Sequence, residues 1–154
     1  MRADKDKACY WQERLGYRSR LKIGVVRSGG FRPEHTEGWV KIARRNILLD
    51  IFAMGLNSVN ADFFSLQKGD PGESEIRNRE NQYWPKGNFY NYADELSEFT
   101  DTAALIENLD LVLSVDTSTA HLAAAMGKPT WLLNGYDTCW RWLLVRRSQT
   151  LSAK

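Results

Sequence analysis

The pattern of hydrophobic and polar positions predicts short buried strands that alternate with helices. Runs of β-branched, leucine and aromatic residues are typical of strands that are buried on both faces of a sheet. Strands are predicted at Leu21–Val26, Asp62–Leu66, Phe89–Tyr92, Leu111–Val115 and Thr130–Leu133. Helical periodicity predicts helices at Ala3–Leu15, Ile47–Gly55, Asp70–Glu80, Thr102–Leu109, Ala120–Met126 and Cys139–Val145. This alternation predicts an α/β fold, a Rossmann-like parallel sheet of about five strands with helices on both faces.

Glycine and polar residues mark where several of these helices begin and end. Gly16, Gly55 and Gly127 each follow a helical run and are predicted to stop it. Thr100 or Asp101 is the predicted N-cap of the helix Thr102–Leu109. Because these signals are local, they fix helix ends before any tertiary contact is considered.

The segment that joins the fourth strand to its helix carries the strongest chemical signal. Asp116, Thr117 and Ser118 follow a buried strand at the carboxyl edge of the predicted sheet, where open α/β sheets bind ligands. The first turn of a helix offers unpaired N–H groups and a partial positive charge to a phosphate or carboxylate. His121 lies near the same helix start. The alternative interpretation is a hydroxyl helix cap, a buried aspartate that braces the turn and a structural histidine.

Other candidates follow the first two strands at the same predicted edge. Ser28 and Gly29 come after the first strand, in a turn where glycine permits close backbone approach to a ligand. Gln67 and Lys68 come after the second strand, and Arg45, or its neighbour Arg44, could meet a diphosphate as a bidentate donor. A plain turn, a surface lysine and a solvated charge pair are the alternatives. No GxGxxG dinucleotide fingerprint is present.

Composition and charge exclude several classes of protein. The chain has 154 residues, a length suited to one domain, and a net charge of +2 without a basic groove for nucleic acid. Its two cysteines make no disulfide framework, and no signal segment or membrane-length apolar run is present. A reducing, cytoplasmic location is therefore expected. His35 and His121 are far apart and show no metal-ligand spacing, so neither a metal nor a cofactor is expected.

The recognisable stretches of the sequence share one resemblance. The run FTDTAALIENLDLVLSVDTSTAHLAAAMGKPTWLLN, together with LKIGVVRSGG, RRNILLDIF, FFSLQKG and DTCWRWLL, resembles bacterial proteins in which tetratricopeptide repeats precede a glycosyltransferase family 9, heptosyltransferase-like region. The resemblance spans about residues 3–144. It implies the two-domain GT-B architecture, of which this chain is similar to the C-terminal half that binds the nucleotide sugar.

The resemblance also implies roles for individual residues. The family's Asp-Thr-Gly-x-x-His motif contacts the phosphates and sugar of the donor, and it corresponds here to the six residues from Asp116 to His121, with Ser118 in place of glycine. The loop after the first strand binds phosphate in the family, which implies roles for Ser28 and Gly29 and, for the basic residue, Arg45. Related repeat proteins usually have tryptophan where this chain has Arg27. Residues after the second strand approach the nucleotide, which implicates Gln67 and Lys68.

These observations predict a linker helix at residues 1–20, a nucleotide-sugar-binding domain at 21–145 and a frayed or aberrant tail at 146–154. The expected function is donor binding in a glycosyltransferase that moves a sugar from a nucleoside diphosphate to an acceptor hydroxyl on a protein or glycan. The catalytic base is expected in the N-terminal half, so the isolated chain is expected to be inactive. A homodimer is a further expectation. The alternatives are a non-catalytic nucleotide-binding module and a nucleotide-sugar epimerase-like enzyme.

Overall fold

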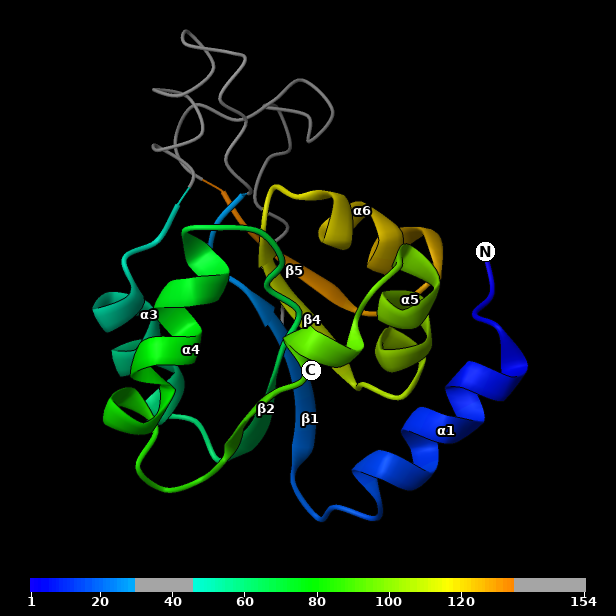
Figure 1. Cartoon of the computed structure of the whole chain (residues 1–154), viewed down its shortest axis with the longest axis horizontal. Helices are drawn as coiled ribbons and strands as arrows, with labels where there is room; N and C mark the ends of the chain where they lie inside the picture. The colour runs from blue at the N-terminus through cyan, green and yellow to red at the C-terminus, as the bar shows by residue number, and fades with distance from the viewer. Residues whose placement is uncertain (30–45, 135–154) are drawn as a thin grey trace, which may run out of the picture.

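The computed structural model describes residues 1–29 and 46–134, which form a five-stranded parallel sheet with helices on both faces (Figure 1). The strand order is β3-β2-β1-β4-β5, and all neighbouring strands are parallel. The predicted α/β, Rossmann-like class is confirmed. The described elements are α1 (Lys5–Leu15), β1 (Leu21–Val26), α3 (Leu49–Asn57), β2 (Ala61–Ser65), α4 (Gly72–Tyr83), β3 (Phe89–Asn91), the 3-10 turn η1 (Ala93–Glu95), α5 (Phe99–Glu107), β4 (Leu111–Val115), α6 (Ser118–Ala125) and β5 (Thr130–Leu133).

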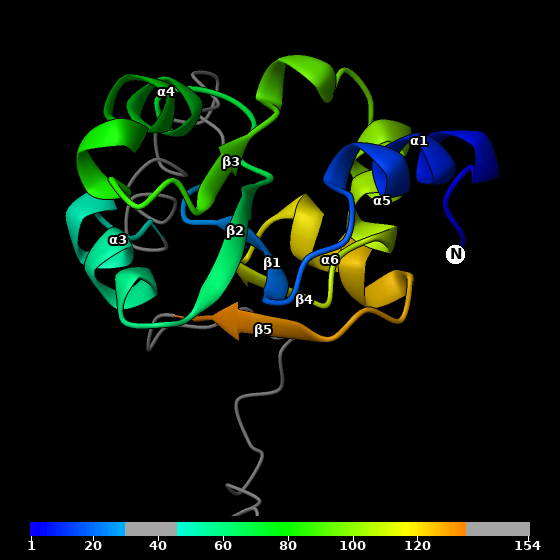
Figure 2. The ribbon, with the colours of Figure 1, turned by 90° about the horizontal axis from the view of Figure 1, so that it is seen from below.

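Alternate strand residues pack on opposite faces of the sheet, which gives the domain two hydrophobic cores. Val25 and Phe63 pack with residues of α3 and α4, whereas Phe64 and Val112 pack with residues of α1, α5 and α6. Figure 2 shows the first pair of helices on one side of the sheet and the other three helices on the opposite side. β1 and β2 are covered on both faces, and they are therefore mostly apolar rather than alternating.

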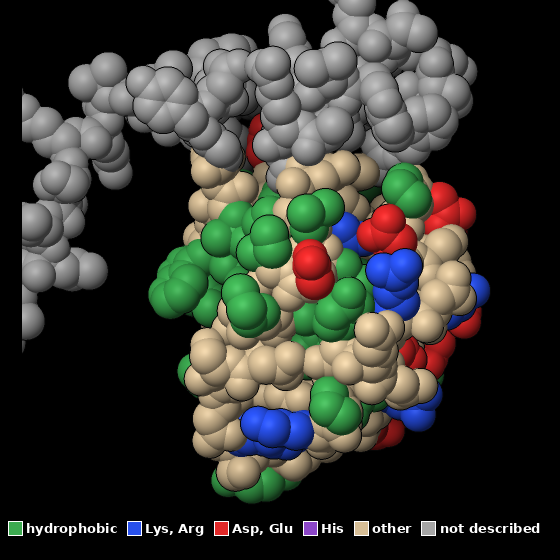
Figure 3. Space-filling model, turned by 90° about the vertical axis from the view of Figure 1, so that its left-hand side faces the viewer, with side chains coloured by type: hydrophobic (Ala, Val, Ile, Leu, Met, Phe, Trp, Pro, Cys, Tyr) green, Lys and Arg blue, Asp and Glu red, His purple; other side chains and the backbone are tan. Residues whose placement is uncertain are grey.

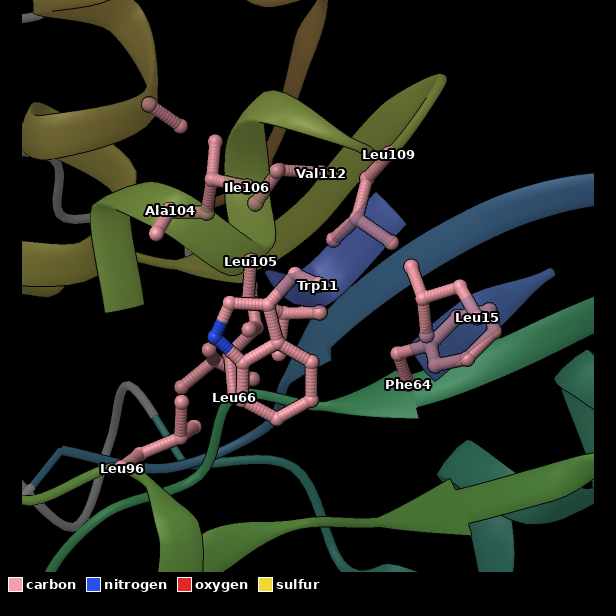
Figure 4. Packing of buried hydrophobic residues seen from close by; sticks show 12 residues of the cluster. Trp11, Leu15, Phe64, Leu66, Leu96, Ala104, Leu105, Ile106, Leu109 and Val112 are labelled. Atoms are coloured by element: carbon pink, nitrogen blue, oxygen red, sulfur yellow. The ribbon is translucent and has the colours of Figure 1, made fainter. Parts of the chain in front are cut away.

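Helix α1 belongs to the second core. Trp11 and Leu15 are buried, and Figure 4 shows them beside Phe64 and Leu105, which come from β2 and α5. The ring of Trp11 also lies 5.3 Å from that of Tyr92, centroid to centroid. The predicted linker helix therefore packs tightly against the domain that follows it.

The direction of the crossovers decides which face of the sheet each described helix covers. Right-handed connections place α3 and α4 on one side of the sheet and α5 and α6 on the other. Among the described residues, no crossover helix covers β4 and β5 on the α3 side, and Trp131 of β5 is 66% exposed. The α3 segment exposes Leu48, Ile51 and Met54, and hydrophobic side chains gather on this side of the molecule (Figure 3).

Several predicted boundaries need correction. Helix α1 begins at Lys5 rather than Ala3, because the carboxylate of Asp4 accepts hydrogen bonds from the next turn and caps the helix. Gly55 does not end α3, which continues to Asn57. Helix α5 begins at Phe99, three residues before the predicted start, because Glu98 is its N-cap.

The remaining boundaries differ by one to three residues. Strand β2 is Ala61–Ser65, β3 ends at Asn91, α4 is Gly72–Tyr83 and α6 is Ser118–Ala125. Gly16 and Gly127 do end their helices, with φ angles of 61° and 76°. The predicted helix Cys139–Val145 and the tail 146–154 lie outside the described residues. Within the described ranges, no helix has both the length and the apolar character needed to cross a membrane.

Candidate functional site

The candidate site lies where β1 and β4 end side by side. The strands are in register, Val26 beside Ser114 on one side of β1 and Val25 beside Ser65 on the other. The segments that follow β1, β2 and β4 therefore emerge at one edge of the sheet. From β1 the chain crosses toward β2 and from β4 toward β5, so this edge holds the topological switch point, where ligands bind in open α/β sheets.

Thr117 fixes the turn from β4 into α6. It is the N-cap, with extended backbone angles, and its hydroxyl oxygen accepts a hydrogen bond from the Ala120 N–H at 3.4 Å. The hydroxyl of Ser114 lies 3.0 Å from that of Thr117 and itself donates to the Val115 carbonyl. The Thr117 hydroxyl therefore donates to Ser114, and both of its roles in the turn are structural.

The first turn of α6 leaves two backbone donors open. In the described part of the chain, the N–H groups of Ser118 and Thr119 donate to no other group, whereas the Ala120 and His121 N–H groups donate to Thr117. Unpaired N–H groups at a helix start attract anions. The start of α6, its hydroxyl cap Thr117 and the two open N–H groups therefore all lie at this turn.

The first turn of α6 also differs from those of the other α-helices in the described residues. Helices α1, α3, α4 and α5 each have at least one acidic residue in the first turn, and α6 has none. An acidic side chain at a helix start balances the positive end of the helix dipole. The first turn of α6 holds no carboxylate, and the Asp116 carboxylate just before the cap lies against His121.

His121 and Asp116 flank the same turn. The Nε2 atom of His121 lies 3.2 Å from Oδ1 of Asp116. The carboxylate of Asp116 is only 6% exposed, whereas the imidazole is 43% exposed. The aspartate therefore orients the ring from inside the turn, and the ring presents its outer part to solvent.

The loop after β1 is held by two carboxamides. The Oε1 atom of Gln67 accepts from the N–H groups of Arg27 and Ser28 at 3.2 and 3.1 Å, and its Nε2 donates to the Ser28 carbonyl at 2.9 Å. Gly29 N–H donates to Oδ1 of Asn46 at 2.9 Å. The three described N–H groups of this loop are therefore bound within the protein.

The hydroxyl of Ser28 points into the protein. It is buried and has no hydrogen-bond partner among the described residues. A Cβ atom at Gly72, the first residue of α4, would overlap the Ser28 hydroxyl and lie 2.9 Å from Nε2 of Gln67. The absence of a side chain at Gly72 therefore makes room for both groups.

Each described cation near the loop has an acidic neighbour on α4. Arg27 is buried, donates to the Ile47 carbonyl and pairs closely with Glu75. Lys68 donates to the Ala93 carbonyl at 2.8 Å and lies 3.9 Å from Glu73. These pairs tie the loop segments to α4 and η1.

The structure thus brings most of the predicted site residues to one edge of the sheet. Ser28, Gly29, Gln67, Lys68, Asp116, Thr117, Ser118 and His121 all lie at the carboxyl edge or in the turn that leaves it. Arg45 lies outside the described residues. Direct contact between any of them and a nucleotide stays a prediction, and the buried carboxamide of Gln67 is bound to the β1 loop.

Sequence reasoning missed the parts played by Asn46 and Gly72. Asn46 holds Gly29, and Gly72 packs against Ser28 and Gln67. These contacts were missed because they join segments that are separate along the chain. The only local signal was the Pro71–Gly72 pair, which marks a turn but not its partners. Within residues 1–29 and 46–134, no group of three or more His, Cys, Asp or Glu residues is arranged to hold a metal ion.

Comparison with known proteins identifies the family. Residues 64–153 match the sequence profile of glycosyltransferase family 9 (heptosyltransferase). The chain belongs to glycosyltransferase family 9. The matched range includes the β4–α6 turn, Gln67 and Lys68, but begins after Ser28 and Gly29.

Structural comparison supports the fold of this family 9 chain. It is similar to the structure of E. coli ADP-heptose lps heptosyltransferase II, with a TM-score of 0.60 at 16% sequence identity. The similarity covers 90% of this chain and 40% of the heptosyltransferase II chain. At this identity the likeness shows the fold alone, a Rossmann-like α/β sheet that matches part of a GT-B heptosyltransferase structure. No curated protein matches the sequence.

Proposed function

We propose that this family 9 chain is the nucleotide-sugar (donor) binding part of a glycosyltransferase. The observation that carries the proposal is the α6 start, which combines two N–H groups left open by the described residues with a first turn free of acidic residues. A nucleoside diphosphate is an anion of the size that such a helix start holds. The position of α6 at the switch point of the sheet supports the same ligand.

The proposed reaction transfers a sugar from the diphosphate to an acceptor hydroxyl. The bond between the anomeric carbon and the diphosphate oxygen breaks, and a bond from the acceptor oxygen to that carbon forms. Negative charge then grows on the departing diphosphate, where the N–H groups of Ser118 and Thr119 stabilise it. In this proposal His121, whose Nε2 lies 3.2 Å from Asp116, donates a further hydrogen bond to the phosphate or the sugar through Nδ1 when the ring is protonated.

The donor and acceptor follow from the family as proposals. The solved relative is an ADP-heptose heptosyltransferase, so ADP is the first diphosphate to test. This chain covers 40% of that protein. In our proposal, the base that takes the acceptor proton belongs to the other half of the GT-B enzyme. The acceptor is a glycan or protein hydroxyl.

Thermal unfolding with ADP, UDP and GDP tests the donor site. A ligand at a hundred times its dissociation constant stabilises the folded state by about 2.7 kcal/mol. For a chain of this length that raises Tm by about 5–10 °C. Cooperative unfolding with no shift from any diphosphate contradicts the proposal.

Thr117→Ala tests where the ligand binds. Loss of the cap frays the α6 start, so affinity for the diphosphate falls about tenfold and the folded state loses about 1 kcal/mol. Thr130→Ala is the control, because it also removes a threonine hydroxyl that is hydrogen-bonded within the protein, to the Lys128 carbonyl 2.9 Å away, at the amino edge of the sheet. Equal affinity in wild type and Thr117→Ala removes the site from this turn.

A further inference from the structure

Gln67 extends the pairing of β1 and β2 beyond the last residues of the strands. Backbone pairing between these strands ends at Val25 and Ser65. Two residues further on, the Gln67 carboxamide accepts from two N–H groups of the β1 loop and donates to the Ser28 carbonyl. The Gln67 side chain thus makes the hydrogen bonds to the β1 loop that the backbone of β2 makes to β1 within the sheet.

The carboxamide has no capacity left for a ligand. Gln67 is 1% exposed, and its Nε2 group also lies 3.4 Å from the Lys68 carbonyl. Gly72 closes the space beside it, because a Cβ there would lie 2.9 Å from Nε2 and 3.0 Å from Cδ of Gln67. Burial and complete hydrogen bonding fix one orientation of the amide group.

The loop that Gln67 holds lies across from the open N–H groups of α6. Ser28 and Gly29 follow β1, and Ser118 follows β4, the strand directly beside it. A diphosphate on the α6 start is therefore flanked by the β1 loop. The backbone path of Ser28 decides how closely the loop approaches that ligand.

We propose that Gln67 is a positioning residue for diphosphate binding, which it controls through the backbone of Ser28 without touching the ligand. This inference rests on the proposed function. It predicts that loss of the carboxamide weakens binding of the diphosphate and leaves recognition of the nucleoside unchanged.

Gln67→Met and Asn88→Leu form the test pair. The methionine side chain keeps the length of glutamine and makes none of its hydrogen bonds. Asn88 carries a second buried carboxamide bound to β2, since its Nδ2 donates to the Ala61 carbonyl at 3.0 Å, at the opposite edge of the sheet. Asn88→Leu therefore measures the effect of losing a buried carboxamide that is bound to the same strand, β2, but lies away from the proposed site.

Calorimetric titration of the 154-residue chain with ADP and with adenosine, at a temperature where all variants are folded, separates the effects. If wild type prefers UDP or GDP, that diphosphate and its nucleoside replace them. Gln67→Met is expected to weaken diphosphate binding about tenfold, the loss that follows from one misplaced hydrogen bond, and to leave nucleoside binding within about twofold. Asn88→Leu changes neither affinity.

Gly72→Ala provides a second, milder variant with its own control. Its Cβ displaces Ser28 and Gln67, whereas a Cβ at Gly55 in α3 meets nothing within 4 Å among the described residues. Alanine favours a helix at both positions, which offsets part of the cost of displacing side chains at Gly72, and both variants are titrated below their Tm. Gly72→Ala is expected to weaken diphosphate binding, and Gly55→Ala is expected to leave it unchanged.

The outcomes separate this inference from the proposed function. If wild type binds no diphosphate, the proposed function fails first. If wild type binds a diphosphate but Gln67→Met and Gly72→Ala bind it equally well, the positioning role is overturned. An equal loss of diphosphate and nucleoside affinity also overturns it, since that is the result of a purely structural role.

Discussion

The two turns that meet at the switch point use their backbone donors in opposite ways. In the β1 loop, the N–H groups of Arg27, Ser28 and Gly29 are bound by protein carboxamides. In the β4–α6 turn, the N–H groups of Ser118 and Thr119 have no partner in the described residues. The backbone donors of the β1 loop are used to hold the loop in place, whereas those of the β4–α6 turn stay open.

The difference shows that position at the carboxyl edge does not decide whether a backbone group is available to a ligand. Both turns follow buried parallel strands, and both contain a small hydroxyl residue. What separates them is the neighbouring segment, because Gln67 reaches the β1 loop and no described side chain reaches the first two N–H groups of α6. Rigid support on one side and open donors on the other is the pre-organised arrangement that the proposed diphosphate site requires.

Ser118→Pro is expected to have the largest effect on diphosphate binding, because it removes a donor from the β4–α6 turn. Proline is favoured at the first helical position, and the extended Thr117 before it is compatible with proline, so the fold is retained. The substitution removes one open N–H group, and diphosphate affinity falls by about 10- to 100-fold, as for a hydrogen bond to a charged group. Isothermal titration measures the change.

Ser118→Ala is the control for that variant. It keeps the N–H group and removes only the hydroxyl, so its affinity stays much closer to that of wild type. Equal losses in the proline and alanine variants assign binding to the hydroxyl and contradict the role of the backbone donor.

Asn46→Ala tests whether the β1 loop depends on its bound N–H groups. It removes the acceptor for Gly29 N–H and leaves that donor partly buried without its partner. Stability falls by about 1 kcal/mol, or about 2–4 °C in Tm, because one hydrogen bond within the protein is lost. Chemical or thermal unfolding measures it, and an unchanged Tm shows that the loop does not depend on this contact.

Asp101→Asn has the smallest expected effect and tests a helix start that the protein fills itself. The hydrogen bond from Lys7, at 2.6 Å, and those from the Glu98 and Ser97 N–H groups hold the pKa of Asp101 below its ordinary value of 3.8, against the opposing effect of burial. A lowered pKa stabilises the fold above that ordinary value and ceases to do so as the pH falls through the folded-state pKa.

Wild type is therefore expected to unfold at a higher temperature than Asp101→Asn at pH 7. The two Tm values converge in acid below pH of about 4. Thermal unfolding across this range measures the convergence, and a difference that persists at low pH assigns the effect to packing. Diphosphate affinity at pH 7 is unchanged, because this helix start is not the ligand site.

Local sequence signals predicted the elements that carry the site. The apolar run Leu111–Val115 placed β4 correctly, and the hydroxyl residues after it located the start of α6 to within two residues. The prediction did not say which hydroxyl residue is the cap, and the structure shows that it is Thr117. The same logic failed at α5, where Thr100 or Asp101 was predicted as the cap and the structure has Glu98. Asp101 is the third residue of the helix and forms a capping box with Glu98, so the helix begins earlier.

The organisation of the β1 loop could not be predicted from local patterns. Gln67 and Ser28 are 39 positions apart, and their contact depends on which strands pair and in what register. Sequence reasoning placed both residues at the carboxyl edge of the sheet but proposed that each contacts the ligand. Only the folded structure shows that Ser28 is buried and that Gln67 serves the loop.

The pairing of β1 with β4 has a consequence for how the domain folds. Between these neighbours in space the chain completes β2 and β3, so their contact is among the most distant in the sequence. Such non-local contacts close late, after a large loss of chain entropy. We therefore expect the β1 loop and the β4–α6 turn to come together only when the middle of the sheet has formed. A ligand held between them resists global unfolding of the domain rather than the opening of one loop.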